Sequence, residues 1–156
     1  MALALERMIA PVTGVPAHPF TEKTDSKLEI SVVFTSVEAT LAALRQAGTL
    51  AKTLGGRITV VVPQIVPYPL PLTSPPVLVD FTERRLRVIA EGCKVETRVS
   101  IYLCRDSRET LLSVLKPHSL VVVGSRKSRW PWPTAEKRLA SQLRRAGHEV
   151  VFTERE

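Results

Sequence analysis

Cysteine and histidine are scarce in this sequence, which contains two cysteines and three histidines among 156 residues. Cys93 and Cys104 are too far apart for a Cys-x-x-Cys redox or zinc motif, and no paired histidines accompany them. Cys104 shortly precedes a helix start at Asp106, where a helix N-terminus can make a thiol reactive, but no histidine is adjacent in sequence. We therefore expect no metal site and a buried, inert Cys104.

Groups that could form a catalytic set are also scarce. The chain contains three aspartates, and no two acidic residues are placed together at the ends of expected strands. The three histidines are scattered along the chain, so none can be assigned as a general base or a ligand. We predict that the protein is not an enzyme and assign no catalytic residue.

Long apolar runs are missing as well. No segment approaches the roughly 20 consecutive apolar residues that a membrane-spanning helix requires. The first ten residues have no basic opening region, and Glu6 and Arg7 interrupt their apolar run, which excludes a secretory signal. We expect a cytoplasmic protein with no membrane partner. The 22 basic residues outnumber 15 acidic ones, and the net charge of +7 favours anionic partners or maintains solubility.

The sequence does contain enough apolar material for one core. Hydrophobic residues make up 44% and charged residues 24% of the chain, the balance of a soluble globular protein. Residues 1–26 contain Pro11, Pro16 and Pro19 and have no sustained hydrophobic period, so we expect an N-terminal arm or tail outside the fold. Residues 27–156 are expected to form one α/β domain.

Strand-like and helix-like segments alternate through this domain. The strand-like segments are rich in β-branched and aliphatic residues, and the segments between them have apolar residues at helical spacing. Gly55-Gly56, Pro117 and Gly147 mark helix ends. The alternation predicts a doubly wound, open parallel sheet of five strands with right-handed crossovers. The expected strands are residues 28–34, 57–62, 94–103, 120–123 and 149–153, and the expected helices are residues 35–54, 77–90, 106–116 and 134–146.

Three segments have patterns that predict their place in the fold. Residues 63–76 include six prolines, so we expect a long, stiff connection that cannot join the centre of the sheet. Residues 94–103 alternate apolar and polar side chains, which favours an edge strand that is half open to water. Residues 120–123 form an unbroken aliphatic run that ends at Gly124, as in a central strand covered on both faces.

The fourth expected strand ends in the sequence Val121-Val122-Val123-Gly124-Ser125-Arg126. In this sequence, in its length and in its order of elements, the chain resembles the universal stress protein family over about residues 28–153. The resemblance implies a Rossmann-like, adenine nucleotide alpha hydrolase-like fold with strand order 3-2-1-4-5 and a role in the stress response. That order places residues 94–103 at an edge of the sheet, in agreement with their alternating pattern.

The resemblance also implies where a nucleotide cleft would lie. ATP-binding members have an acidic residue where this chain has Phe34, and a glycine-rich motif whose glycines let backbone amides approach phosphates. Gly124 matches the first glycine, but Lys127, Lys137 and Arg138 occupy the other motif positions. The resemblance therefore implies weakened or absent ATP binding, and we expect no cofactor. The cofactor-binding positions implied by the family are Phe34, Thr35, Gly124, Ser125, Arg126 and Lys127.

A basic, aromatic loop follows the fourth expected strand and leaves alternatives open. Arg126, Lys127 and Arg129 could hold a phosphate or another anion through their side chains. Trp130 and Trp132 add aromatic rings, a combination that single-stranded nucleic acid binders use. The tryptophans could instead cover a hydrophobic edge or form a dimer contact. We favour such a contact over nucleic acid, because no nucleic-acid-binding motif accompanies the loop.

The last expected strand indicates a partner. Universal stress proteins commonly pair through this strand, and here Val150, Val151 and Phe152 form an apolar stretch that needs to be covered or paired. The leading hypothesis is a non-catalytic regulatory or interaction module of this type that forms a homodimer. A stress sensor that binds ATP or another anion beyond Gly124 is the second hypothesis, and a nucleic-acid-binding protein is the third.

Overall fold

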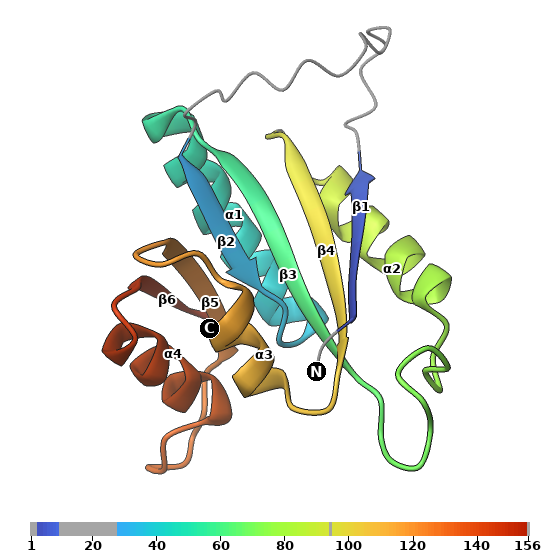
Figure 1. Cartoon of the computed structure of the whole chain (residues 1–156). Coiled ribbons are helices and arrows are strands. Elements are labelled where there is room, and N and C mark those ends of the chain that lie inside the picture. The colour runs from blue at the N-terminus through green and yellow to red at the C-terminus, as the bar shows by residue number, and fades with distance from the viewer. Residues whose placement is uncertain (1–2, 10–27, 94, 156) are drawn as a thin grey trace, which may run out of the picture.

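A computed structural model of the chain describes residues 3–9, 28–93 and 95–155 (Figure 1). Its strands are β1 (Leu3–Ile9), β2 (Glu29–Val33), β3 (Arg57–Ile65), β4 (Thr97–Cys104), β5 (Leu120–Arg126) and β6 (Glu149–Arg155). They form one sheet in the order β1-β4-β3-β2-β5-β6. The five strands from β4 to β6 are parallel, and their order is 3-2-1-4-5 when they are numbered along the chain. This confirms the expected α/β fold and strand order.

The N-terminal part of the chain contributes a sixth strand. β1 runs antiparallel to β4, with Leu3 opposite Leu103 and Ile9 opposite Thr97. The expectation that the arm lies outside the fold is therefore wrong for residues 3–9, while residues 10–26 fall outside the described ranges. The side chains of β1 do not alternate strictly between apolar and polar, so the pattern gave no strand signal. Its backbone nevertheless satisfies the open hydrogen-bonding edge of β4.

β4 is consequently an interior strand, flanked by β1 and β3. Val99 and Ile101 on one of its faces are fully buried, whereas Arg98 and Tyr102 on the other face are only half-buried. The alternation of residues 94–103 therefore reflects an open sheet face. The expectation that these residues form the outermost strand is wrong, because an open face and an open edge produce the same alternating pattern.

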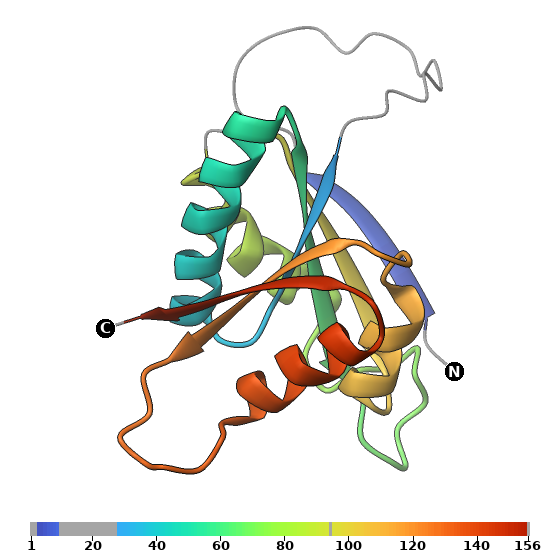
Figure 2. The ribbon, with the colours of Figure 1, turned by 90° about the vertical axis from the view of Figure 1, so that its left-hand side faces the viewer.

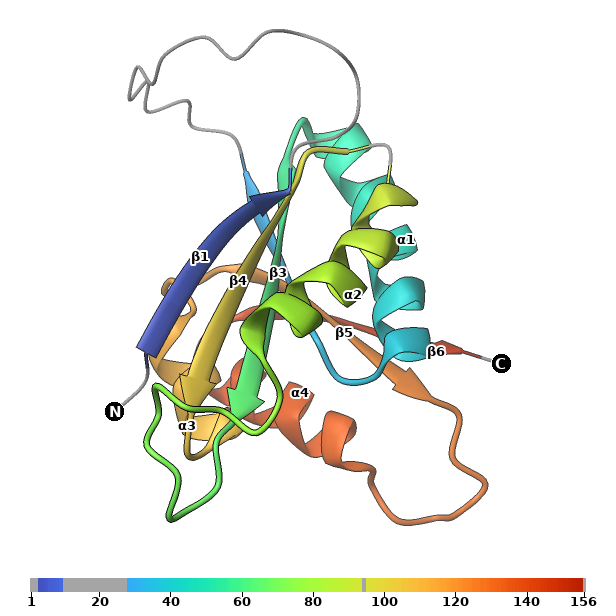
Figure 3. The ribbon, with the colours of Figure 1, turned by 90° about the vertical axis from the view of Figure 1, so that its right-hand side faces the viewer.

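Four helices cover the sheet. They are α1 (Val37–Leu54), α2 (Val79–Glu91), α3 (Ser107–Val114) and α4 (Ala135–Arg145). α1 lies on one face of the sheet, and α3 and α4 lie on the other (Figure 2), while α2 shares the face of α1 (Figure 3). Ser36 caps α1, and Gly55 ends it in the left-handed conformation with φ of 66°. Asp106 and Thr134 cap α3 and α4 as the sequence predicts. None of the helices in the described ranges is long and apolar enough to cross a membrane.

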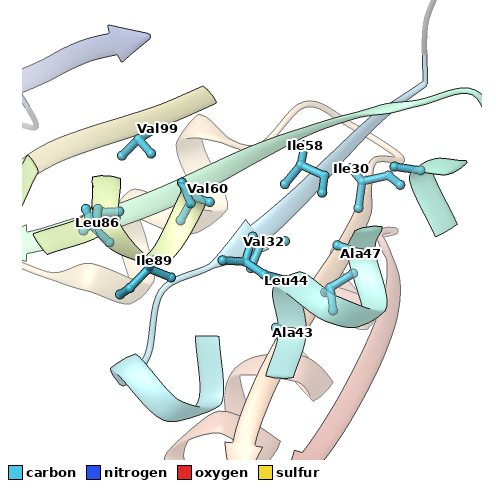
Figure 4. Packing of buried hydrophobic residues seen from close by; sticks show 14 of the residues in the cluster. Ile30, Val32, Ala43, Leu44, Ala47, Ile58, Val60, Leu86, Ile89 and Val99 are labelled. Carbon is cyan, nitrogen blue, oxygen red and sulfur yellow. The ribbon is translucent and has the colours of Figure 1, made fainter. Parts of the chain in front are cut away.

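The hydrophobic core has two parts, one on each face of the sheet. The larger part lies between the sheet and α1 and α2, where Leu44 packs with Val32 and Val60 (Figure 4). The smaller part lies beneath α3 and α4 and contains Leu111 and Leu143. Because β2 and β5 are covered on both faces, their apolar side chains are buried without interruption, as their aliphatic sequences predict.

Pro63 lies within β3, although we expected the proline-rich connection to begin there. Phe34 N donates to Val61 O at 2.9 Å, so the odd-numbered residues of β3 direct their backbone groups toward β2. β2 ends at Val33, one register position before the level of Pro63. The missing N–H of Pro63 therefore faces no strand and removes no hydrogen bond from the sheet.

Candidate functional site

A crevice of about 520 Å³ lies at the carboxyl ends of β2 and β3, between the first turns of α3 and α4. β2 continues into α1 on one face of the sheet, whereas the neighbouring β5 continues into α4 on the other face. The two connections diverge here, which is the place where doubly wound sheets bind their ligands. The crevice is therefore the first candidate for a small-molecule site.

Two of the six predicted site residues, Phe34 and Thr35, line this crevice. The hydroxyl of Thr35 donates a hydrogen bond of 3.0 Å to the carbonyl oxygen of Gly124 and so ties the end of β2 to β5. Phe34 packs against the core cluster beneath α1. An apolar side chain at this position offers no hydrogen bond to a ligand, in contrast to the acidic residue of the ATP-binding pattern.

Gly124 serves close packing in this structure. A Cβ atom at this position would lie 2.0 Å from the carbonyl oxygen of Ala39 and 2.7 Å from its carbonyl carbon. The first turn of α1 therefore contacts the backbone of β5 directly, and only glycine leaves room for it. Gly124 does not line the crevice, and the space beside its Cα atom is filled by the backbone of α1.

The three remaining predicted residues also lie away from the crevice. Ser125 is buried, and its hydroxyl donates to the carbonyl of Arg126 at 3.1 Å. Arg126 still belongs to β5, which is longer than expected because it pairs with β6 as far as Arg155. Lys127 N donates to Arg155 O at 3.2 Å. The expectation that the loop begins at Ser125 is wrong, since two of its residues are part of the sheet.

Two carboxylates lie beside the cations that replace the family's glycines. Lys137 Nζ is 2.7 Å from a carboxylate oxygen of Glu154. Arg126 Nε and Arg155 Nη1 lie 3.6 and 3.8 Å from the same oxygen of Glu38. Such partly exposed ion pairs add little to stability. They do reduce the positive potential that a bound phosphate would experience.

The crevice contains polar groups that local sequence patterns could not assign to it. Arg108 of α3 and Arg138 of α4 line it together with Gln142. The Oε1 atom of Gln142 is buried and has no hydrogen-bond partner within the described ranges, so it can accept a hydrogen bond from a ligand. Arg108 and Gln142 meet only because α3 and α4 converge, and no motif within one segment could reveal this.

The tryptophans of the basic loop are open to solvent. Trp130 is 77% exposed and Trp132 is 74% exposed. This excludes the alternative that they cover a hydrophobic edge of their own chain. A contact with a second molecule, whether a protein or a nucleic acid, stays open.

The cysteines are not placed for chemistry. Cys104 is fully buried, as expected, and its Sγ lies 3.8 Å from the carbonyl oxygen of Gln64. Burial raises the pKa of the Cys93 thiol, which lowers the fraction of reactive thiolate. In the part of the chain that the structure describes, no three histidine, cysteine or acidic side chains gather to hold a metal ion.

The sheet order, the helices on both faces and the crevice at the strand ends define an α/β protein of Rossmann-like architecture. No protein-family model matches this chain, and no curated protein is significantly similar to it in sequence. The resemblance to the universal stress proteins stays a prediction from the sequence.

Proposed function

We propose that this chain is a non-catalytic regulatory or interaction module of universal-stress type, which forms a homodimer through β6 and has weakened or absent nucleotide binding. The observation that carries this proposal is the hydrogen-bonding edge of β6, which no other described strand covers. The nucleotide part is supported by the packing of Gly124 and by the ion pairs around it.

The backbone of β6 presents alternate residues to the open edge. Glu149 N donates to Ser119 O at 3.1 Å, so the odd-numbered residues of β6 direct their backbone groups toward β5. The even-numbered residues Val150, Phe152 and Glu154 direct theirs outward. An unpaired row of this kind is a template for another strand.

Side chains around β6 define where such pairing begins. Arg144 Nη2 donates to Val150 O at 3.2 Å and thereby covers the first outward carbonyl. Phe152 and Glu154 then supply the outward backbone groups for a partner strand. Val150, Val151 and Phe152 are only half-buried in the single chain. A second copy offers the same edge, so the two strands can pair about a twofold axis.

Replacing Glu154 with proline is expected to convert the dimer into a monomer. Proline removes the outward N–H of residue 154, and proline is tolerated at an edge because this N–H makes no bond to β5. Glu154→Ala is the matched control, since both variants lose the ion pair with Lys137 while alanine keeps the N–H. Light scattering should report a dimer for the wild-type chain and Glu154→Ala, and a monomer for Glu154→Pro.

Circular dichroism of the three proteins checks that the proline leaves the fold intact. A wild-type chain that is monomeric at micromolar concentration would rule out the β6 dimer. A Glu154→Pro variant that stays dimeric and folded would place the dimer contact elsewhere on the surface.

ATP with magnesium is expected to leave the melting temperature of the protein unchanged. The backbone beside Gly124 is occupied by α1, and Glu38 and Glu154 would repel a triphosphate. A ligand that binds the native state at 100 times its dissociation constant adds about 2.7 kcal/mol to stability, which a thermal-shift titration detects readily. A dose-dependent rise that Arg138→Gln abolishes would contradict this expectation.

That result would support a second candidate function, a sensor that binds a nucleotide or another anion in the crevice. The volume of the crevice falls within the roughly 300–1,000 Å³ of small-molecule sites. Arg108 and Arg138 supply positive charge, and Gln142 Oε1 supplies an acceptor without a partner in the described ranges. Glu136 also lines the crevice and lowers its net positive charge.

A further inference from the structure

One face of the sheet is only partly covered by helices. α3 and α4 lie over β5, β6 and the ends of β2 and β3, and Figure 1 shows no described helix in front of the middle of β3 and β4. On this face Ser31, Thr59 and Arg98 occupy one register row across three strands. Ser100 follows two residues after Arg98 and therefore points to the same face.

A hollow of about 250 Å³ lies on this face, at the opposite end of β2 from the crevice. The connection from α3 to β5 closes one side of it. The residues used in the argument below are Ser31, Thr59 and Ser100 on the floor and Glu29, Arg57 and Lys116 at the rim.

Two hydroxyl groups on the floor are buried and lack partners. Ser31 is 7% exposed and Ser100 is 3% exposed. Neither hydroxyl makes a hydrogen bond to any residue in the described ranges, although both side chains line the hollow. Buried polar groups in native proteins are almost always paired with protein, water or ligand. These hydroxyls are therefore two donors directed at whatever fills the hollow.

The rim of the hollow has an excess of positive charge. Lys116 Nζ lies 2.7 Å from Glu29, and Thr59 Oγ1 donates to the same carboxylate at 2.9 Å. Partial burial raises the pKa of Glu29, but these hydrogen bonds and the charges of Lys116 and Arg57 outweigh it and hold the pKa below its ordinary value. The ionised carboxylate balances Lys116. Within the described ranges the Arg57 guanidinium has no hydrogen bond or ion pair, so its charge is available to a ligand.

We propose that this hollow binds a small oxyanion, carried as the phosphate or carboxylate group of a metabolite. Arg57 provides a charge-assisted contact, and the hydroxyls of Ser31 and Ser100 donate to the anion's oxygens. The hollow is smaller than the roughly 300–1,000 Å³ of drug-sized sites, so its ligand has few atoms and is not a nucleoside triphosphate. The proposal is independent of the β6 dimer and of the crevice.

Titrations with inorganic phosphate, with succinate and with neutral glycerol test the proposal at constant ionic strength. Amide chemical shifts of Ser31, Thr59 and Ser100 should change saturably with phosphate, with succinate or with both, and not with glycerol. A response to phosphate alone identifies a phosphate ligand, and a response to succinate alone identifies a carboxylate. A hydrogen bond to a charged group is worth enough that Ser100→Ala should weaken binding by about tenfold.

Matched variants separate a built site from general attraction to a basic protein. Arg57→Gln should weaken binding at least as strongly as Ser100→Ala. Arg45→Gln, which changes an exposed arginine of α1 on the other face, should have no effect, and neither should Ser141→Ala on α4. If Arg57→Gln does not fold, Ser100→Ala against Ser141→Ala decides the question. Absence of saturable shifts, or equal weakening by Arg45→Gln and Arg57→Gln, would overturn the proposal.

Discussion

Replacing Gly124 with alanine is expected to lower the free energy of unfolding by about 3 kcal/mol, because the new methyl group would be forced against the backbone of α1. Its Cβ atom would lie 2.0 Å from the carbonyl oxygen of Ala39. A flexible side chain could rotate away from such a contact, but backbone cannot. Relief therefore requires the whole first turn of α1 to move away from β5. Urea denaturation followed by circular dichroism measures the change.

Gly48→Ala is the matched control for this substitution. Gly48 lies within α1, and an added Cβ atom would have no neighbour within 4 Å beyond its local helix. Alanine is favoured over glycine in a helix interior by about 1 kcal/mol, so this variant should be more stable than the wild-type chain. The two substitutions should thus change stability in opposite directions. A Gly124→Ala variant as stable as wild type would show that α1 and β5 are farther apart than described.

The contact between Gly124 and Ala39 also changes how variants at this position should be interpreted. Glycine at the end of β5 fits a phosphate-binding loop and equally fits close packing of a helix on a strand. The structure shows the packing. A loss of ligand binding in Gly124→Ala would therefore follow from damage to the fold, and variants of Arg108 or Arg138 are better probes of the crevice.

The strand order and the helix caps could be predicted because they depend on local patterns. Asp106 and Thr134 each precede an amphipathic segment and accept the expected backbone hydrogen bond. Alternating strand and helix segments with short connections leave few topologies other than the observed parallel sheet. Phe34 and Thr35 follow β2 directly, so their position at the crevice also follows from sequence.

The rest of the candidate site depends on contacts between distant segments. Arg126 meets Glu38 only because the start of α1 lies beside the end of β5. Lys137 meets Glu154 only because β6 extends beyond its apolar residues. Neither pair has a sequence signature. Sequence reasoning therefore predicted a basic anion-binding loop, where the structure has cations paired with carboxylates.

A chain that begins at Leu28, and so lacks β1, is expected to be less stable and to self-associate. Ile58 N donates to Glu96 O at 3.1 Å, so the even-numbered residues of β4 direct their backbone groups toward β3. The odd-numbered residues face β1 and are opposite its residues in an antiparallel register. Each lost hydrogen bond costs about 0.5–1.5 kcal/mol, and the uncovered edge becomes a template for another strand.

Hydrogen exchange within β4 provides an internal control for this prediction. The amides of Val99 and Ile101 should lose protection in the shortened chain, whereas those of Ser100 and Tyr102 should stay protected by β3. Light scattering at several concentrations should show the accompanying association. Equal exchange of Val99 and Ile101 in both chains would mean that β1 does not pair with β4 in solution. Residues 97–104 would then be the outer strand that their alternating side chains first indicated, and the open polar face and the open edge would belong to the same strand.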